Sequence, residues 1–350
     1  MMRRLLISLA LFFAALTPLQ ASEAEESFDM KAYLFGHIQD SYDWHITSWG
    51  GRHISIPLPC IVYQKDCGAA VFLSSRLEDG ESYKGYRIAS DGEPHAGKIV
   101  CSDASGAVVC PLDISITKNV LALMISAALL LVIILSCSRW YRRHDVLKEA
   151  PSGIAGLLEP VIMMIDDEVI RPSIGPGYEK FSPYLLTAFF FILINNLMGI
   201  VPFFPGGANV TGNIAVTMAL ALFTFLAVNL FGNKHYFKEI FWPDVPVFLK
   251  AIPIMPVIEI IGMFTKPFSL MIRLFANILA GHILILSVIA MIFITAKMGA
   301  VLNGSLTVVA VLFGVFMDCL ELLVAFIQAY VFTMLSAVFI GMAHPQEQTE

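Results

Sequence analysis

Two apolar stretches near the end of the chain, Pro256 to Thr295 and Ser305 to Met342, far exceed the length that a membrane crossing needs. At about 1.5 Å of rise per residue, a helix over either stretch would reach roughly 60 Å, against about 30 Å of hydrocarbon in a bilayer. Ordinary membrane helices tilt by about 20°. These two must tilt far more steeply, kink at Pro267, or both, so the sequence predicts an antiparallel pair of long, slanted membrane helices.

The composition agrees with a protein that is largely surrounded by lipid. Apolar residues make up 57% of the chain and charged residues 14%, whereas soluble domains have about 45–50% and about 25%. The formal net charge of −6 does not suggest nucleic-acid binding, and half of the acids fall in the first 115 residues. We predict an all-α polytopic membrane domain over residues 119–350, with about five membrane helices near 120–137, 183–201, 213–231, 256–295 and 305–342.

The chain begins with features that are typical of an export signal. Residues 1–21 have a short basic start, an apolar core and small residues near Ala21, which predicts a secretory signal peptide. An uncleaved anchor helix is the alternative, although the apolar core is short for a span of about 20 residues. Residues 22–118 carry short strand-like runs broken by Gly, Pro and Asp. They predict a small, mixed or mostly β domain on the periplasmic side.

Four cysteines fall in this exported segment: Cys60, Cys67, Cys101 and Cys110. In an oxidising compartment they could form one or two disulfides, and unpaired thiols are the alternative. A metal site is less favoured, because no closely spaced pair of cysteine ligands occurs.

The charges that flank the first span predict the topology. Arg139, Arg142 and Arg143 follow that span directly, and an excess of Arg and Lys marks the cytoplasmic side. This agrees with an exported N-terminal domain and predicts a cytoplasmic C-terminus in a bacterial inner membrane. Residues 153–177 are only moderately apolar and carry several acids, so we expect an amphipathic helix that lies on the cytoplasmic surface without spanning.

A stripe of polar residues runs along the first of the two long stretches. Glu259, Lys266 and Arg273 recur every seven residues and Asn277 follows four later, so all four share one helix face. An arginine at membrane depth costs about 2.5–3.5 kcal/mol on insertion scales, which makes a functional role the default interpretation. Snorkelling to the interface is the alternative for Arg273, and it is the favoured interpretation for Lys266. Glu259 and Asp318 fit either an access path or a snorkelling acid.

The register of the hairpin brings polar residues of the two helices together at two levels. If the turn is centred on Val301, the numbers of facing residues should sum to about 602; Arg273 with Gln328 gives 601 and His282 with Glu321 gives 603. His282 lies about 180° around its helix from Arg273, which favours two separate polar regions. A histidine beside a carboxylate suits proton relay, because imidazole titrates near neutrality. A histidine that only bonds two helices together is the alternative.

Several of these residues lie in segments that resemble a known family. The stretch PFSLMIRLFANILAGHILI closely resembles the signature of the a subunit of F-type ATP synthases, with an arginine before Leu-Phe-small-Asn and a titratable residue nine positions on. The similarity covers roughly Gly153 to His344 and includes NNLMGIVP, Glu259 and ELLVAFIQAYVF. Some members have an acid at the position of His282 and a histidine at that of Glu321, so the pair looks exchanged. Many also have a small residue where this chain has Met271.

The resemblance implies a stator subunit that conducts protons beside a rotating ring of c subunits, held to the rest of the ATP synthase by a b-subunit stalk. It implies that Arg273 faces the ring carboxylates, with two offset half-channels on either side. Site residues carry over as follows: Glu321 and His282 to the outer half-channel, Glu259 and Asn277 to the inner one, and Gln328 to a place beside the arginine. We expect no catalytic site, cofactor or metal in this chain, and no GxxxxGK[ST] nucleotide motif occurs.

Two other function classes compete with this interpretation. A secondary ion transporter or channel could use Arg273 and Glu321 as its site, although such folds usually contain internal repeats and none is evident here. A membrane scaffold whose charges only fix helix packing is the other. Recovery of the chain together with a proteolipid ring would distinguish the stator from both.

Overall fold

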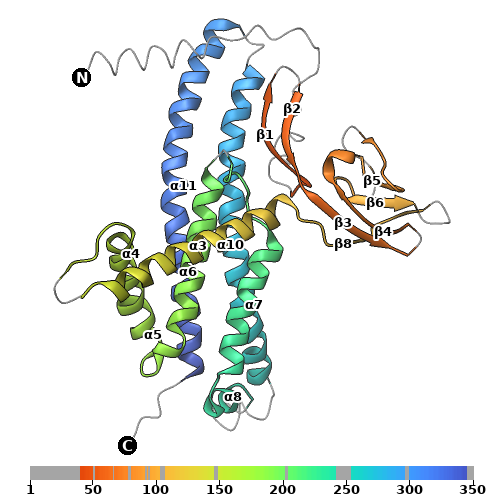
Figure 1. Ribbon diagram of the computed structural model, residues 1–350. Helices are drawn as coiled ribbons and strands as arrows, with labels where there is room; N and C mark the ends of the chain where they lie inside the picture. Colours follow the sequence, from red (N-terminus) through yellow and green to blue (C-terminus); the bar gives the residue numbers. More distant parts are fainter. Residues whose placement is uncertain are drawn as a thin grey trace, which may run out of the picture.

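The computed structural model describes residues 40–344 except for the segments 50–51, 66, 78–79, 91–92, 94, 103–106, 146–148, 202–203, 242–253 and 296–298. Two long helices, α10 (Ile254–Thr295) and α11 (Ala300–Ala343), run side by side through the helical body, and the strands lie to one side of it (Figure 1). The predicted signal peptide, residues 1–21, lies outside the described residues.

Residues 40–117, here named the β region, form three small antiparallel sheets. Inward-facing residues alternate along β3 and β4, where Cys60, Val62, Ala70 and Phe72 are buried between exposed neighbours. The alternation is that of sheets with one face on a core and one face in solvent, and it confirms the predicted β character in the described residues. The pairs are β1 (Asp43–Trp49) with β2 (Arg52–Pro57), β3 (Pro59–Gln64) with β4 (Gly68–Leu73) and β8 (Leu112–Asp113), and β6 (Ile99–Ser102) with β5 (Tyr86–Ile88) and β7 (Val108–Val109).

Three cysteines of the β region follow the second of the two sequence alternatives, unpaired thiols. Cys60, Cys67 and Cys110 are free thiols in the structure. Cys60 is fully buried in the core of the β region, and Cys67 is half-buried. Burial, followed by the nearby negative charge of Asp113, raises the pKa of the Cys60 thiol to about 11.

We therefore expect iodoacetamide to alkylate Cys60 at least about 100-fold more slowly than Cys67 at pH 8. Thiolate is the reactive form, and raising the pKa of Cys60 from the ordinary 9.0 to about 11 lowers its thiolate fraction by about 100-fold at this pH. Peptide mass spectrometry of the native protein over a time course measures both rates. Equal rates at the two positions would contradict the buried placement of Cys60.

A long apolar helix, α3 (Lys118–Arg143), follows the β region directly. The hydroxyl of Thr117 caps its N-terminus by accepting from the backbone N–H of Val120, which satisfies one of the free donors of the first turn. Arg142 and Arg143 lie in its last turn, where the helix dipole stabilises positive charge. In the view of Figure 1, α3 runs across the direction of α10 and α11.

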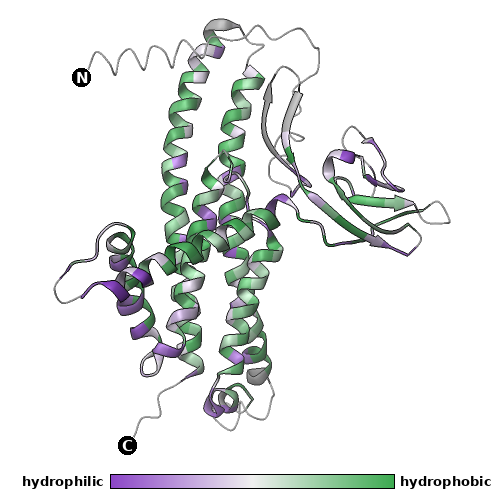
Figure 2. Ribbon diagram, in the orientation of Figure 1, coloured by the Kyte–Doolittle hydropathy of each residue, from purple (hydrophilic) through white to green (hydrophobic). Residues whose placement is uncertain are grey.

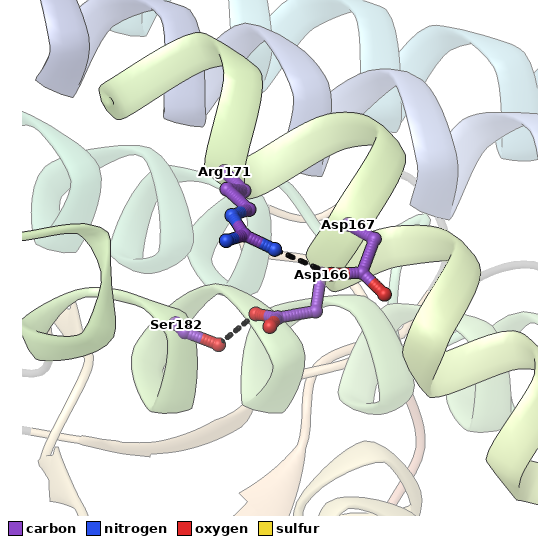
Figure 3. Close-up of polar contacts among 4 residues, drawn as sticks. All are labelled: Asp166, Asp167, Arg171 and Ser182. Atoms are coloured by element: carbon purple, nitrogen blue, oxygen red, sulfur yellow. Dashed lines mark hydrogen bonds and ion pairs between the residues drawn. The ribbon is translucent and has the colours of Figure 1, made fainter. Parts of the chain in front are cut away.

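The predicted non-spanning segment is helical but irregular. It consists of α4 (Ile154–Met163), a π-helical stretch η3 (Met164–Ile170) and α5 (Arg171–Ile174). Figure 3 shows how polar contacts hold it: Ser182 donates to Asp166, and Arg171 lies 3.5 Å from Asp167. The first contact ties the π-helical stretch to the start of the next long helix, and the sequence pattern did not predict the π-helical turns.

Two helices pack against the long pair. After the short turn η4 (Tyr178–Lys180), α6 (Ser182–Ile200) packs on α11, and α7 (Ile214–Leu230) packs on α10 before the short helix α8 (Lys234–Phe241). Within the described residues four helices are long and apolar enough to cross a membrane: α3, α6, α10 and α11. The apolar helix α7 has only 17 residues. Apolar residues dominate these helices along their lengths (Figure 2), and the chain is a polytopic membrane protein.

The long hairpin is present, but its turn falls earlier than predicted. α10 continues without interruption through Pro267. α11 begins at Ala300, directly after Gly299 at φ +96°, so Val301, the predicted centre of the turn, lies in the first turn of the helix. The helix tolerates Gly304 in its own first turns, although the sequence pattern assigned that glycine to the loop. At about 1.5 Å per residue each helix is roughly 60 Å long.

Gly341, near the end of α11, allows two backbones to touch. A Cβ at this position would collide with the backbone carbonyl oxygen of Ser173 in α5. We expect Gly341→Ala to destabilise the folded protein by about 1–3 kcal/mol, since overpacking against backbone cannot be relieved by a rotamer change. Heating in detergent, followed by the fraction that stays monodisperse, measures this effect.

Gly262→Ala in α10 is the matched control, because a Cβ there meets nothing within 4 Å. Alanine is favoured over glycine by about 1 kcal/mol in a helix, so this variant should be at least as stable as the parent. Similar losses at both positions would remove the argument from backbone contact.

Candidate polar site in the helix hairpin

The structure brings His282 of α10 and Glu321 of α11 together, as the register predicts. Nδ1 of His282 lies 2.7 Å from Oε1 of Glu321, and the two side chains are only 16% and 6% exposed. Glycines give them room: a Cβ on Gly281 would lie 3.1 Å from Oε1 of Glu321, and one on Gly199 of α6 would lie 3.4 Å from Nε2 of His282. The pair is therefore enclosed by three helices and has an acid and an imidazole in direct contact.

A buried amide links α6 to α11 one helical turn from this pair, and the sequence interpretation assigned it no role of its own. Asn196 of α6 donates to the carbonyl oxygen of Ala325, one helical turn after Glu321. Its own carbonyl oxygen accepts from Thr211, which follows α6 in the chain. The signal that could have found Asn196 is the Asn-Asn pair inside an apolar run, because polar side chains at membrane depth need partners. Nothing in the sequence pattern indicated Thr211.

Arg273 lies on the exposed side of α10, away from the His282–Glu321 pair. Its side chain is exposed, and among the described residues no acid or hydrogen-bond acceptor contacts it. Ile272 and Ala276, its exposed neighbours, are apolar. Met271 instead packs into the main core with 7% exposure, so its bulk does not lie on the surface around Arg273. One turn before and after the arginine, Ser269 and Asn277 are exposed and polar but uncharged.

Gln328 of α11 is joined to α10 one turn beyond the arginine. The side-chain amide of Asn277 donates to Oε1 of Gln328 at 2.7 Å, and Gln328 is 2% exposed. The register paired Gln328 with Arg273; the structure pairs it by hydrogen bond with Asn277, four residues later. The facing levels are thus nearly as predicted, while the bonding partner differs.

The remaining candidate residues lie apart from the pair. Glu259 is exposed near the start of α10. Lys266 places its ammonium 5.7 Å from the ring centroid of Phe339, an arrangement that favours a cation. Asp318 is exposed on α11, three residues before Glu321. None of these three takes part in the His282–Glu321 contact.

A second cluster of polar side chains joins three helices, nearer to the start of α6 than the His282–Glu321 pair. Thr224 of α7 is 2.9 Å from the Tyr184 hydroxyl and 3.2 Å from that of Ser336. Sequence reasoning missed this group, because single hydroxyl residues in apolar helices give no periodic signal. Its bonds link α6, α7 and α11 into one unit.

The arrangement can move protons and hold charge, but it offers little to a metal ion. In the part of the chain that the structure describes, no three His, Cys, Asp or Glu side chains gather as metal ligands. His282 and Glu321 can exchange a proton across their 2.7 Å contact. Arg273 stays charged at any physiological pH and can attract an anion without transferring a proton.

Comparisons with known proteins agree with this chemistry. The family described as ATP synthase A chain matches residues 121–341, and a domain of unknown function, DUF8433, matches residues 33–117. ATP synthase subunit a 2 of Chlorobaculum tepidum is 47% identical over 242 residues, 67% of this chain and 65% of that protein. ATP synthase subunit a of Chlorobium phaeobacteroides is 40% identical over 307 residues, 81% of this chain and 85% of that protein. That of Myxococcus xanthus is 41% identical over 239 residues, covering 66% and 74%.

The first match covers just under two thirds of the Chlorobaculum protein, and the second covers most of both chains. Members of this family are multi-pass proteins of the bacterial inner membrane that assemble within the ATP synthase. The chain therefore belongs to the ATP synthase A chain family, the proton-translocating stator subunits of the membrane sector, which carry no catalytic site.

Proposed function

We propose that this chain conducts protons through two half-channels that meet a ring of c subunits at Arg273. The observation that carries the proposal is the exposed arginine on a long apolar helix, with no counter-ion among the described residues of its own chain. A charge at membrane depth is costly without a partner. A carboxylate on a neighbouring, moving polypeptide supplies that partner.

In this mechanism the arginine divides the two paths by electrostatics. A ring carboxylate that arrives beside Arg273 is favoured in its ionised form, because the guanidinium is a permanent cation in a setting of low dielectric constant. The carboxylate releases its proton to one path and takes another from the second path after the ring has turned. The fixed charge blocks direct proton passage from one path to the other.

The outer path runs through His282 and Glu321, whose contact is nearly closed to solvent. The inner path includes Glu259 and Asn277 on α10. Asn277 shares a hydrogen bond with Gln328, which keeps both amides beside the arginine. The His282–Glu321 contact and the face of Arg273 and Asn277 lie on different sides of α10, which suits two offset half-channels better than one continuous proton path.

The proposed topology places the β region in the periplasm and the C-terminus in the cytoplasm. Residues 1–21 act as a cleaved signal, residues 22–118 form the exported domain, and residues 119–350 the membrane domain, with α7 as the fifth span. The basic end of α3 supports this orientation. A b-subunit stalk holds the chain to the rest of the enzyme.

Photo-crosslinking from the exposed surface tests the contact with the ring. We expect p-benzoylphenylalanine in place of Ala276, an exposed residue one turn from Arg273, to capture a short proteolipid in the intact enzyme. The reason is that Ala276 shares the exposed surface of α10 with the arginine. Immunoblotting and mass spectrometry identify the captured partner.

The matched control replaces Leu131 of α3, which is 61% exposed on a helix that carries no charged stripe. This position should not capture the proteolipid. Capture from position 131 but not from position 276 would overturn the assignment of the ring to the α10 surface.

A further inference from the structure

One aromatic residue of the β region packs directly on the membrane helices. Trp44 of β1 is 3% exposed and clusters with Ala122 of α3 and with Ala208 and Val210 of the α6–α7 loop, residues 201–213. Its ring lies 5.2 Å from that of Phe204 in the same loop, in an edge-to-face arrangement, which is favourable for aromatic pairs. Trp44 thus joins the β region to a loop between two membrane helices.

A second set of contacts fixes the β region to the start of α3. The carboxylate of Asp40 accepts from the backbone N–H of Asn119 at 3.0 Å. The backbone N–H of Lys118 donates to the carbonyl oxygen of Ser41 at 2.9 Å. Asp40 and Ser41 precede Trp44 in the chain by four and three residues. They hold the strand that carries Trp44 at a defined place relative to the membrane helices.

The loop beneath Trp44 and the side chain of His282 approach the same residue of α6. The position of a Cβ on Gly199 is 3.4 Å from Nε2 of His282 and 3.7 Å from the carbonyl oxygen of Ala208. His282 and Ala208 therefore both lie next to Gly199. Thr211 of the same loop is 1% exposed and donates to Asn196, the amide that bonds to α11 one turn beyond Glu321.

We infer that Trp44 is a positioning residue for the outer proton pathway, and that the β region holds the α6–α7 loop against the His282–Glu321 pair through it. The inference rests on the proposed function, which assigns the outer pathway to that pair. Without the indole, the loop loses the packing that keeps Ala208 next to Gly199, the residue of α6 that His282 also approaches. It also loses support for the Thr211–Asn196 hydrogen bond. The exported domain thereby gains a function in proton conduction.

The test uses the whole ATP synthase in membrane vesicles, stripped of its catalytic head so that passive proton conductance is measured alone. We expect Trp44→Ala to lower conductance by about fivefold or more at unchanged subunit content, since small misplacements of reacting groups have large rate effects. Trp44→Phe keeps an aromatic ring beside Phe204 and should retain more than about half of the conductance. Val71→Ala, at a residue 69% exposed on β4, should leave it unchanged.

A labelling experiment reports the position of the loop independently of flux. Val210 is 2% exposed, so Val210→Cys should resist a membrane-impermeant maleimide when Trp44 is present and react when Trp44 is replaced by alanine. Ile214→Cys, at a residue 49% exposed, should react in both backgrounds. If Trp44→Ala fails to assemble, Phe204→Ala truncates the half-exposed ring on the loop side instead, and it should lower conductance by about twofold.

Normal conductance in an assembled Trp44→Ala enzyme would overturn the inference, as would a Trp44→Phe enzyme as defective as Trp44→Ala. Where only Phe204→Ala assembles, normal conductance in that variant has the same consequence. Glu321→Gln, measured in parallel, distinguishes a failure of the positioning role of Trp44 from a failure of the proposed outer pathway. If Glu321→Gln blocks conductance and Trp44→Ala does not, only the positioning role falls; if both conduct normally, the proposed outer pathway falls as well.

Discussion

Arg273→Ala is expected to lower ATP-driven proton pumping by at least about a hundredfold while the enzyme still assembles. Removing one partner of a desolvated ion pair costs about 3–5 kcal/mol, and each 1.4 kcal/mol is a factor of ten. Assembly should survive, because the arginine is exposed and contacts no acid among the described residues. Acidification of inverted vesicles on addition of ATP, followed with a pH-sensitive dye, measures the effect.

Two further substitutions make this result specific. Arg171→Ala removes an exposed arginine that contacts Asp167 and the ring of Tyr178, and it should leave pumping within about twofold, because exposed ion pairs contribute about 0–1 kcal/mol. Arg273→Lys keeps a cation but not the planar, permanently charged guanidinium, so pumping should stay low. Near-normal pumping by Arg273→Ala would exclude the arginine as the divider between the two paths.

Glu321→Gln should reduce proton flux by about tenfold or more, the second largest effect we expect. The glutamine side chain has nearly the same shape, so packing around His282 and Gly281 is kept, but the group can no longer take up a proton. General acid–base groups contribute about 10²–10⁴-fold to the reactions that they serve. Passive proton conductance of vesicles without the catalytic head measures flux through the membrane sector alone.

The control for this substitution is Glu179→Gln, the same chemical change at an exposed acid of η4. It should leave conductance unchanged. The exchanged variant, His282→Glu with Glu321→His, tests whether the two groups act as a pair: it should conduct better than either single change, because an acid and an imidazole again face each other. Equal conductance for Glu321→Gln and Glu179→Gln would remove the relay proposal.

Residue spacing alone predicted that His282 and Glu321 face each other, because each helix advances by a fixed rise per residue. Along two antiparallel helices the sum of facing residue numbers stays nearly constant, and it is 603 for His282 with Glu321 and 605 for Asn277 with Gln328. The predicted turn at Val301 was late, yet both sums are close to the predicted 602. Single bonds are less predictable, because side-chain reach decides them: Gln328 bonds with Asn277 rather than with Arg273.

Residues of the loop and the β region could not be placed in this way. Ala208 and Thr211 gain their places against α6 from the path of the α6–α7 loop, and Trp44 gains its place from the packing of the β region on that loop. The sequence also left open whether the cysteines form disulfides, because whether two thiols meet depends on how the sheets pack.

The sequence by itself determined the membrane class, the approximate bounds of the long apolar helices and the seven-residue stripe that carries Arg273. These follow from bilayer thickness and helix pitch, which act on residues close together in the chain. Only the tertiary structure decided that Arg273 is exposed while Glu321 is enclosed, and that Gly199 of α6 lies beside His282. Those outcomes depend on contacts between different helices, up to 129 residues apart in the chain, because tertiary packing decides which of several equally apolar faces is buried.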